Sequence, residues 1–289
     1  MDIQKLLSSL TIEEKIGQMM QLPPSFFIED INVEVYGIVN ALNLNKKKIF
    51  EAGSVLGINN STQMIEVQKK YLKESRHKIP LVFMADIIHG YKTIFPVPLA
   101  MAASWNTDLA YQAAKVQAKE SRVSGVQVTF SPMVDISRDP RWGRIVEGFG
   151  EDPYLSSQFS KSIVKGYQGD DISKIDQVAS CVKHFAAYGS PDGGRDYNTV
   201  DISNYSLYNI YLPSYKAAID AGVKLVMTSF NTIDSIPATV NQFLLKDILR
   251  KRWEFKGVTI SDYDSLHQVV AHGVAENDRE AAYRGVNAG

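Results

Sequence analysis

Four polar side chains that could carry out chemistry stand at the ends of apolar runs. Asp86 follows the stretch PLVFMA, Lys183 and His184 follow VASCV, and Asp262 follows GVTIS. Removing such a charge from water is costly unless it pairs with another group or takes part in function. Carboxylates accept hydrogen bonds from sugar hydroxyls, and Lys and His donate or accept the others. The set therefore suits a polyol ligand.

The elements that position these side chains alternate along the chain, as short runs of branched residues followed by amphipathic stretches. The candidate strands are 16–21, 53–57, 79–86, 126–134, 178–185, 224–230 and 257–262. The candidate helices include 62–75, 107–124, 154–168, 204–221 and 242–252. An earlier helix is predicted to begin at Thr11, where Thr11 and Glu14 form a capping box.

Such alternation predicts the α/β class, with βα units around a parallel sheet. The expected architecture is a (β/α)8 TIM-type barrel, truncated before its last strand because only seven candidate strands are present. In a parallel barrel the carboxyl ends of all strands lie on one face, where the loops build the active site. Asp86, Lys183, His184 and Asp262 are therefore expected to converge.

The composition is that of an ordinary globular chain of 289 residues, with 45% hydrophobic and 22% charged residues. A net charge of -1 argues against a nucleic-acid or membrane-surface partner. No stretch is apolar and long enough to span a bilayer. Cys181, the single cysteine, excludes an internal disulfide and a Cys-based metal cluster. The opening MDIQKLLSSLTIEEK has no long apolar segment, so no signal peptide and a cytoplasmic location are expected.

Each of these residues also has a structural interpretation. Asp262 could cap the next helix, although Asp264 is better placed because Ser265 begins the helical pattern. Lys183 could extend from a strand end to solvent, and His184 could be a hydrogen-bonded core histidine. Only the combination of these residues at strand ends favours a functional site.

A metal site at Asp86 and His89 is a further alternative. The five histidines never show the HExxH spacing or a similar ligand pattern, so no metal and no other cofactor is expected.

Longer motifs now point to a family. The segments 85–105, 131–155, 183–189, 227–241 and 257–266 resemble the barrel domain of glycoside hydrolase family three. The resemblance runs from about residue 5 to the end and is nearest to the bacterial β-glucosidase branch. It implies that residues 1–289 form the N-terminal (β/α) barrel domain of such an enzyme, without the α/β sandwich domain that follows it in the family.

The resemblance implies a role for each matching residue. Asp262 corresponds to the catalytic nucleophile, and the remaining matches correspond to residues that contact the sugar. These are Asp86, Arg144, Lys183, His184 and Met227, with Arg195 as a weaker candidate and Tyr263 as a stacking platform. Glu147 would support the loop that carries Arg144. Positive charge on Lys183 and Arg144 would favour the ionised form of Asp262.

The implied activity is that of a retaining, exo-acting β-glycosidase, a β-glucosidase that hydrolyses O-glycosidic bonds through a covalent glycosyl-enzyme on Asp262. Two positions depart from the family pattern. Phe230 stands where many relatives have a Tyr whose hydroxyl lies near the nucleophile, and Tyr263 stands where many have Trp. The expected partner is a β-glucoside or oligosaccharide substrate.

The family's general acid/base is the remaining requirement. In the β-glucosidase branch a Glu of the C-terminal domain supplies it, and in another branch a histidine after the KHF motif does. Here the stretch 186–198 contains no histidine. The chain is therefore expected to be an N-terminal fragment whose active site the C-terminal domain completes. A non-catalytic sugar-binding barrel and a Schiff-base lyase that uses Lys183 are the alternatives.

Overall fold

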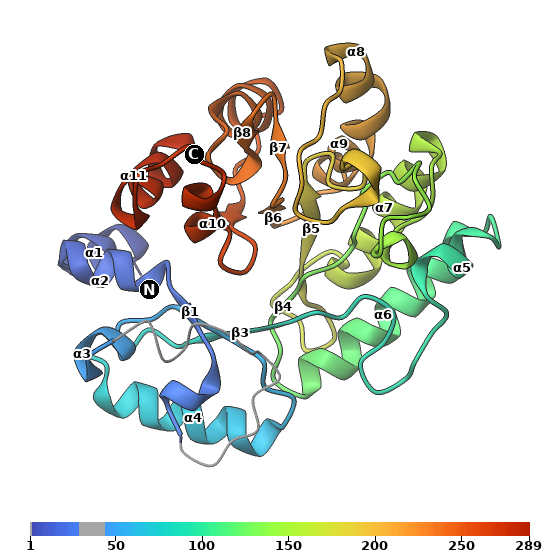
Figure 1. The fold of residues 1–289 in the computed structure, drawn as a ribbon. Coiled ribbons are helices and arrows are strands. Elements are labelled where there is room, and N and C mark those ends of the chain that lie inside the picture. The colour runs from blue at the N-terminus through green and yellow to red at the C-terminus, as the bar shows by residue number, and fades with distance from the viewer. Residues whose placement is uncertain (1, 29–43) are drawn as a thin grey trace. The chain divides into compact units, whose positions relative to one another are not determined.

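The computed structural model describes residues 2–28 and 44–289 (Figure 1). The chain divides into two compact units. The first comprises Met1–Ala85 and Ser121–Thr129, and the second comprises Asp86–Glu120 and Phe130–Gly289. In the described residues, no helix combines the length and the apolar character that a membrane span requires.

The first unit is built on four parallel strands that follow one another in chain order, β1 to β4. Ser54 pairs with both Gln21 and Val82, and Met84 pairs with Val128. Its elements are α1 (Ile3–Ser9), α2 (Ile12–Gln18), β1 (Gln21–Leu22), η1 (Pro24–Phe26), α3 (Lys46–Ile49), β2 (Ser54–Leu56), α4 (Ser61–Glu74), β3 (Val82–Ala85) and β4 (Val128–Thr129).

The start of α2 confirms the predicted capping box. The Thr11 hydroxyl accepts from the backbone N–H of Glu14, and the Glu14 carboxylate accepts from the backbone N–H of Thr11. The helix that begins at this box extends to Gln18, and β1 begins only at Gln21. The strand predicted for 16–21 is therefore wrong. The apolar periodicity of Ile12 and Ile16 belongs to the helix rather than to a strand.

The second unit contains three further parallel strands, ordered β5-β6-β9. Cys181 pairs with Leu225, which also pairs with Val258, and the segment 132–134 runs parallel to β5 through Lys183. The helices and strands are α5 (Pro98–Ala102), α6 (Thr107–Val123), η3 (Ile145–Glu147), α7 (Pro153–Gln168), β5 (Ala179–Phe185), η4 (Asp192–Gly194), α8 (Asn204–Ser206), η5 (Leu207–Tyr211), α9 (Pro213–Asp220), β6 (Leu225–Thr228), β7 (Thr232–Ile233), β8 (Ile236–Pro237), η6 (Ala238–Val240), η7 (Phe243–Arg252), β9 (Val258–Ile260), α10 (Ser265–Ala271) and α11 (Asp278–Ala288).

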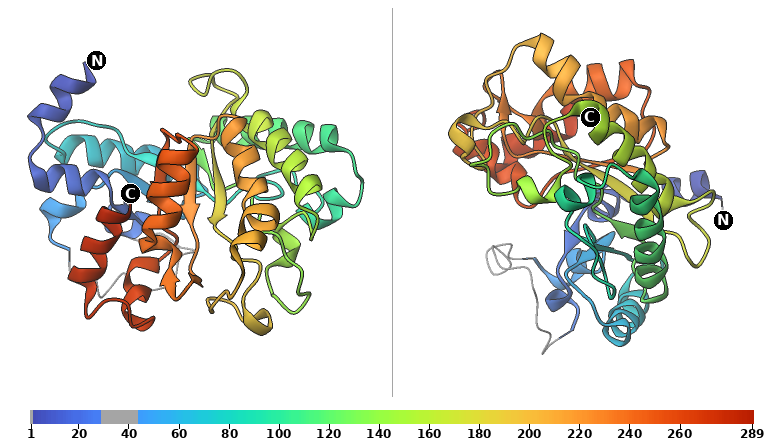
Figure 2. Two further views of the ribbon diagram at one scale, coloured as in Figure 1. Left: turned by 90° about the horizontal axis from the view of Figure 1, so that it is seen from above. Right: turned by 90° about the vertical axis from the view of Figure 1, so that its right-hand side faces the viewer.

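The core of the second unit lies between these strands and their helices. Helices α7 and α9 pack against each other and against β5 (Figures 1 and 2). Every residue of β5 and β6 is buried. Phe149 stacks on Phe159 with 5.2 Å between ring centroids, and Phe185 meets Tyr215 edge to face at 5.4 Å. Burial on both faces is typical of strands in a parallel sheet covered by helices.

Two of the predicted helices are less regular than their apolar pattern suggests. The stretch 204–221 divides into α8, a π-helical turn over Leu207–Tyr211, and α9. Pro213 explains the interruption because it has no N–H and fits only the first turn of a new helix. The stretch 242–252 forms a helix with π-helical hydrogen bonding over Phe243–Arg252. Apolar spacing does not distinguish these from a regular α-helix.

The other predicted helices and strands agree with the structure apart from their ends. The candidate 126–134 is longer than β4, which covers only Val128–Thr129. Asp264 occupies the N-cap position of α10, which begins at Ser265 as predicted, but it has a left-handed backbone (φ 59°) and its side chain makes no capping hydrogen bond. The described residues contain seven strands that pair in parallel, four in one unit and three in the other. This confirms the α/β class.

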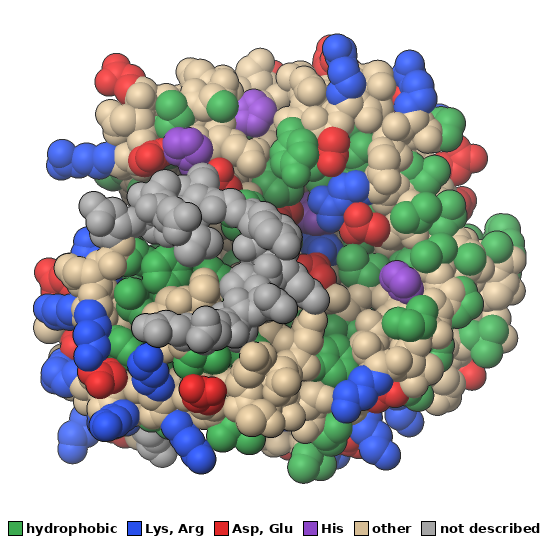
Figure 3. Space-filling model, turned by 60° about the horizontal axis from the view of Figure 1, so that its bottom comes forward, with side chains coloured by type: hydrophobic (Ala, Val, Ile, Leu, Met, Phe, Trp, Pro, Cys, Tyr) green, Lys and Arg blue, Asp and Glu red, His purple; other side chains and the backbone are tan. Residues whose placement is uncertain are grey.

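Charges of both signs are interspersed over the face shown in Figure 3. Asp and Glu side chains lie there among Lys and Arg side chains, and the net charge of the chain is -1.

Replacing Gly166 by Ala should destabilise the protein although Ala favours a helix by about 1 kcal/mol. Gly166 is buried in α7, and a Cβ there would lie 2.6 Å from the carbonyl oxygen of Tyr111 and 2.7 Å from the Cβ of Ala114. Overpacking against a backbone atom costs about 1–3 kcal/mol, so the steric effect should dominate. Urea unfolding of the variant should show a lower midpoint.

Gly143→Ala is the matched control. Nothing lies within 4 Å of a Cβ at Gly143, and its backbone is outside the left-handed region. This variant should unfold at the same or a higher urea concentration because Ala restricts the unfolded chain. A Gly166→Ala protein as stable as the control would show that α6 and α7 do not pack as closely as described.

Candidate active site

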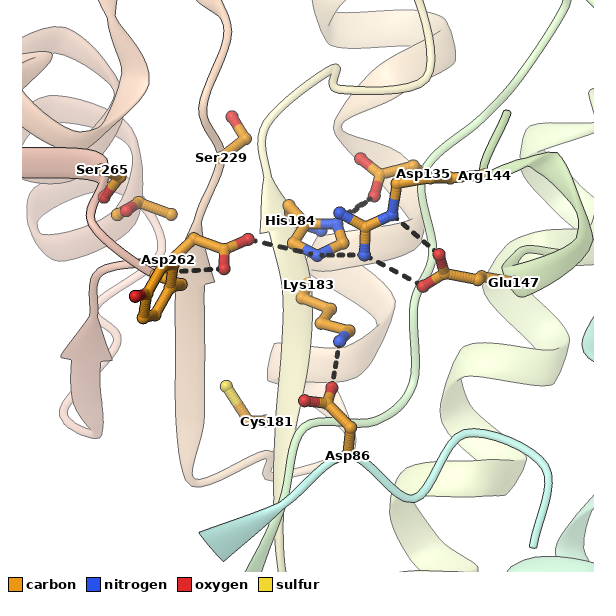
Figure 4. Close-up of polar contacts among 12 residues, drawn as sticks. Asp86, Asp135, Arg144, Glu147, Cys181, Lys183, His184, Ser229, Asp262 and Ser265 are labelled. Carbon is orange, nitrogen blue, oxygen red and sulfur yellow. Dashed lines mark hydrogen bonds and ion pairs between the residues drawn. The ribbon is translucent and has the colours of Figure 1, made fainter. Parts of the chain in front are cut away.

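The first pair of the site joins the residue after β3 to the end of β5. Nζ of Lys183 donates to Oδ1 of Asp86 (Figure 4). The Lys183 side chain is only 5% exposed, whereas that of Asp86 is 49% exposed. A buried ammonium is thus neutralised by a carboxylate that remains accessible from outside. The pair presents oxygen acceptors and N–H donors side by side.

His184, the next residue of β5, is held by the buried carboxylate of Asp135. Oδ2 of Asp135 lies 2.8 Å from Nδ1 of His184 and accepts from its backbone N–H at 3.0 Å. Tyr215 of α9 donates from its hydroxyl to Oδ1 of Asp135 and to the carbonyl oxygen of His184. These contacts fix the imidazole in one orientation at the end of the strand.

Arg144 approaches the other nitrogen of this imidazole. Its Nη2 lies 3.1 Å from Nε2 of His184, and its guanidinium is bound at two points by Glu147, at 2.7 and 3.0 Å. The guanidinium also lies over the ring of Tyr188, 5.5 Å from its centroid. Burial alone would lower the pKa of Arg144, but the Glu147 carboxylate overcomes this and holds it above its usual range.

The electrostatics of this cluster favour a neutral imidazole. Burial and then the Arg144 charge hold the pKa of His184 well below its usual range. Burial also raises the pKa of Asp135, against the hydrogen bonds from Tyr215 and the His184 backbone. Since charge on the imidazole is disfavoured, its contact with Asp135 is a hydrogen bond from Nδ1–H, which leaves the lone pair of Nε2 to accept from Arg144.

Asp262 lies beside His184 with its two oxygens in different environments. Oδ1 accepts from the backbone N–H of Tyr263 at 2.6 Å. Oδ2 is buried and has no hydrogen-bond partner among the described residues. Its neighbour at 3.4 Å is Nε2 of His184, which carries no proton in the tautomer set by Asp135. A buried carboxylate oxygen without a donor is costly in a folded protein, and such groups occur at sites of chemistry.

An aromatic cluster adjoins these charged groups. Tyr188 meets His184 edge to face at 5.2 Å and Trp142 at 5.3 Å, and Phe230 lies 4.6 Å from Tyr197. Trp142 donates from its indole N–H to Asp196 at 2.8 Å, which ties the loop after β5 to the loop that carries Arg144. Tyr197 is 48% exposed, so this cluster has one solvent-accessible ring.

The structure brings five of the sequence-predicted residues into two sets of contacts, Asp86 with Lys183 and Arg144 with His184 and Asp262, which meet because Lys183 and His184 are consecutive in β5. It also pairs Glu147 with Arg144. Lys183, however, is paired with Asp86, so the positive charge expected beside Asp262 is already neutralised there.

Three further predicted residues have different surroundings. Nε of Arg195 donates to the carbonyl oxygen of Asp192 in its own loop. Met227 is buried in β6 opposite Ile260 of β9, and the side chain of Tyr263 is 46% exposed. Among the described residues no group of three or more His, Cys, Asp or Glu side chains could hold a metal ion.

Sequence reasoning missed Asp135 and Tyr215. Asp135 follows the apolar stretch 126–134, which is the same signal that singled out Asp86 and Asp262, so it could have been found. Tyr215 carries no such signal because it is one apolar position of a helical pattern. Only the packing of α9 against β5 brings its hydroxyl to Asp135.

Comparisons with known proteins place the chain in a family. Residues 11–289 match the model of the glycosyl hydrolase family 3 N terminal domain. A periplasmic beta-glucosidase of Salmonella typhimurium is 39% identical over 99% of this chain, and a putative beta-xylosidase of Formosa agariphila is 32% identical over the same share. The crystal structure of a beta-glucosidase from Listeria innocua in complex with glucose superposes on 99% of the chain with a TM-score of 0.95 and 49% identity.

The first of these relatives corrects one expectation. Its name places it in the periplasm, which contradicts the cytoplasmic location expected from the start of the sequence. The first residues alone are therefore not a guide to the compartment.

The chain spans well under half of the proteins it matches, covering 36% of the Salmonella relative and 40% of the Listeria structure. Its agreement with that structure confirms the architecture expected for a truncated TIM-type barrel. With a family model that matches nearly all of its length, the chain belongs to glycosyl hydrolase family 3.

Proposed function

We propose that this chain carries the nucleophile and the glycone-binding residues of a retaining, exo-acting β-glycosidase, with a β-glucoside as its substrate. The observation that carries the proposal is the asymmetry of Asp262. One carboxylate oxygen is held by a backbone N–H, and the other is buried beside neutral His184 with no donor among the described residues. An oxygen whose lone pairs are not used by donors is available to attack an electrophile.

In the proposed reaction Oδ2 of Asp262 attacks the anomeric carbon of the sugar. A bond forms between this oxygen and the carbon while the bond to the leaving-group oxygen breaks, which gives a covalent glycosyl-enzyme. Water then attacks the same carbon, loses a proton to a base and releases Asp262 as a carboxylate. Two successive inversions at this carbon retain its configuration.

The other polar residues would hold the sugar hydroxyls. The accessible Asp86 carboxylate can accept from two of them, and Lys183 and Arg144 can donate to their oxygens. Met227, Arg195 and Tyr263 remain candidates for the rim of the site. Relatives named both beta-glucosidase and beta-xylosidase are consistent with glucose or xylose as the glycone.

The general acid/base is proposed to come from outside these 289 residues. The chain covers only 36–40% of the length of these relatives, so they are roughly two and a half times as long as this chain. A following α/β domain would place a Glu over the glycosidic oxygen and so complete the site. Residues 1–289 would then form the N-terminal barrel domain of the longer enzyme.

The Schiff-base alternative has less support. A lyase needs Lys183 as a free amine that faces a carbonyl substrate. Here Nζ of Lys183 donates to Asp86, and its side chain is 5% exposed. Reduction with borohydride in the presence of a carbonyl substrate would trap an adduct on Lys183 only if the protein were such a lyase.

A 2-deoxy-2-fluoro-β-glucoside with a dinitrophenolate leaving group should label the chain once, on Asp262. The fluorine slows hydrolysis of the glycosyl-enzyme, and dinitrophenolate leaves without a proton from an acid, so the label accumulates without the general acid. Peptide mapping by mass spectrometry would locate it. Asp262→Asn should remain unlabelled.

Asp264→Asn is the matched control for this labelling. It removes a carboxylate two residues away, and Asn tolerates the left-handed backbone at this position. This variant should label like the unmodified protein. If glucose binds in calorimetry but no label forms, the chain is a sugar-binding barrel, and the proposal of a nucleophile fails.

The dependence on the leaving group tests the proposed origin of the acid. Dinitrophenyl β-glucoside should give a burst of about one dinitrophenolate per chain, followed by slow turnover. Cellobiose should be cleaved about 10²–10⁴-fold more slowly by this chain than by a longer one that includes the following domain, since protonation of the leaving group contributes that much. Equal cellobiose turnover by both chains would place the acid within residues 1–289.

His184 should remain neutral over the pH range in which an ordinary histidine side chain gains a proton. Its pKa is lowered by burial and by Arg144, so a proton is added only well below the usual range. His267 is an internal control because its exposed ring contacts Asp278, which raises its pKa. In ¹⁵N-resolved NMR between about pH 5 and 8, His267 should titrate and His184 should keep the Nδ1–H tautomer. Titration of His184 in this range would contradict the neutral acceptor described above.

A further inference from the structure

Three buried hydroxyls form a chain behind the loop that carries Asp262. Oγ1 of Thr228 lies 2.7 Å from Oγ1 of Thr239, which lies 3.2 Å from Oγ of Ser265. None of the three residues is more than 5% exposed. They come from the end of β6, from η6 and from the first residue of α10. The hydroxyls therefore connect three elements that are separated in sequence.

The last link of this chain reaches the Asp262 backbone. The N–H of Ser265 donates to the carbonyl oxygen of Asp262 at 3.2 Å, and Ser265 lies on the side of Asp262 away from His184 (Figure 4). Strand β9 ends at Ile260, so its pairing with β6 does not extend to Asp262. Asp264 provides no side-chain cap and has a left-handed backbone. The anchoring of Ser265 is thus a principal constraint on this loop.

We propose that Thr239 is a positioning residue for the nucleophile, acting through Ser265. The inference rests on the proposed function of Asp262 and adds the group that fixes the direction of its carboxylate. Thr239 need not touch the sugar: its hydroxyl holds Ser265, Ser265 holds the carbonyl of Asp262, and the loop then keeps Oδ2 beside His184. Thr228 holds Thr239 in turn, from the strand that neighbours β9.

Attack on an anomeric carbon is sensitive to such a constraint. A displacement of about 1 Å in a reacting group can slow a reaction about 100-fold. Asp86 and Lys183, which are proposed to hold sugar hydroxyls, pair with each other and not with the three hydroxyls. Loss of the Thr239 hydroxyl should therefore slow the formation of the glycosyl-enzyme while it leaves reversible sugar binding nearly intact.

The test compares Thr239→Val with Thr239→Ser in the 289-residue chain. Valine has the shape of threonine but no hydroxyl, and serine keeps the hydroxyl without the methyl group. The measured quantity is the rate at which the dinitrophenyl 2-deoxy-2-fluoro-β-glucoside labels Asp262. We expect the rate to fall about 10- to 100-fold in Thr239→Val and to be largely restored in Thr239→Ser. Ser265→Ala, which removes the other hydroxyl of the Thr239–Ser265 contact and keeps the backbone N–H, should resemble Thr239→Val.

Thr232→Val is the matched control. Thr232 is also buried, at 4% exposed, and its hydroxyl has no hydrogen-bond partner among the described residues. The same substitution there should leave the labelling rate unchanged. Calorimetry with glucose should give dissociation constants within about twofold for the unmodified chain, Thr239→Val and Thr239→Ser. Such agreement would show that the sugar-binding site is still folded and that a slower labelling rate reflects the orientation of Asp262.

The outcomes are distinct. If the unmodified chain is never labelled on Asp262, the proposed function fails. If it is labelled and Thr239→Val is labelled equally fast, the function stands and the positioning role is overturned. A slow Thr239→Val with weakened glucose binding, or a Thr239→Ser that is as slow as Thr239→Val, would also overturn it, because either result points to packing rather than to the hydroxyl.

Discussion

The hydrogen bond between Asp135 and His184 is the contact on which the rest of the candidate site depends. Both side chains are almost completely buried, and the carboxylate binds the imidazole and the backbone N–H of the same residue. Tyr215 of α9 completes this arrangement. Once Asp135 fixes the proton on Nδ1, Nε2 can only accept, and it accepts from Arg144 rather than donating to Asp262. One buried hydrogen bond thereby determines what the groups on the other side of the ring can do.

The ion pairs of the site also leave Asp262 with an oxygen that has no donor. Lys183 is neutralised by Asp86 and Arg144 by Glu147, so each described cation that approaches the cluster already has a carboxylate partner. Like Asp262, Asp135 has no cation, but neutral donors bind both of its oxygens, whereas the buried oxygen of Asp262 has no donor among the described residues. In a medium of low dielectric constant this is an unstable arrangement for a structural residue, since a donor would stabilise it by roughly 1–3 kcal/mol. It is a suitable arrangement for a group that forms a bond to a positively polarised carbon.

Much of this could be predicted from the sequence, because strands that end in a polar residue leave a local signal. Asp86, Lys183, His184 and Asp262 were found in this way, and the parallel βα pattern placed them on one face. The predictions that failed concern features that depend on contacts between residues distant in sequence, or on two local sequence signals that favour different structures. The segment 16–21 has a strand-like composition, yet the capping box at Thr11 extends a helix into it. Tyr215 has no local signal at all, and its role follows only from the packing of α9 on β5. The widened helix over Phe243–Arg252 has the same apolar spacing as a regular one.

The hydroxyl chain behind Asp262 shows why such contacts escape sequence analysis. Thr228, Thr239 and Ser265 are residue types found in many loops, and nothing in their spacing distinguishes them. Their effect arises because β6, η6 and α10 meet at one point in the folded chain. The loop after β9 cannot be held by strand pairing, since β9 ends two residues before the carboxylate. A side chain placed beyond the end of a strand, as Asp262 is, becomes more accessible and loses the rigidity of the sheet, so side chains from neighbouring elements must restore that rigidity.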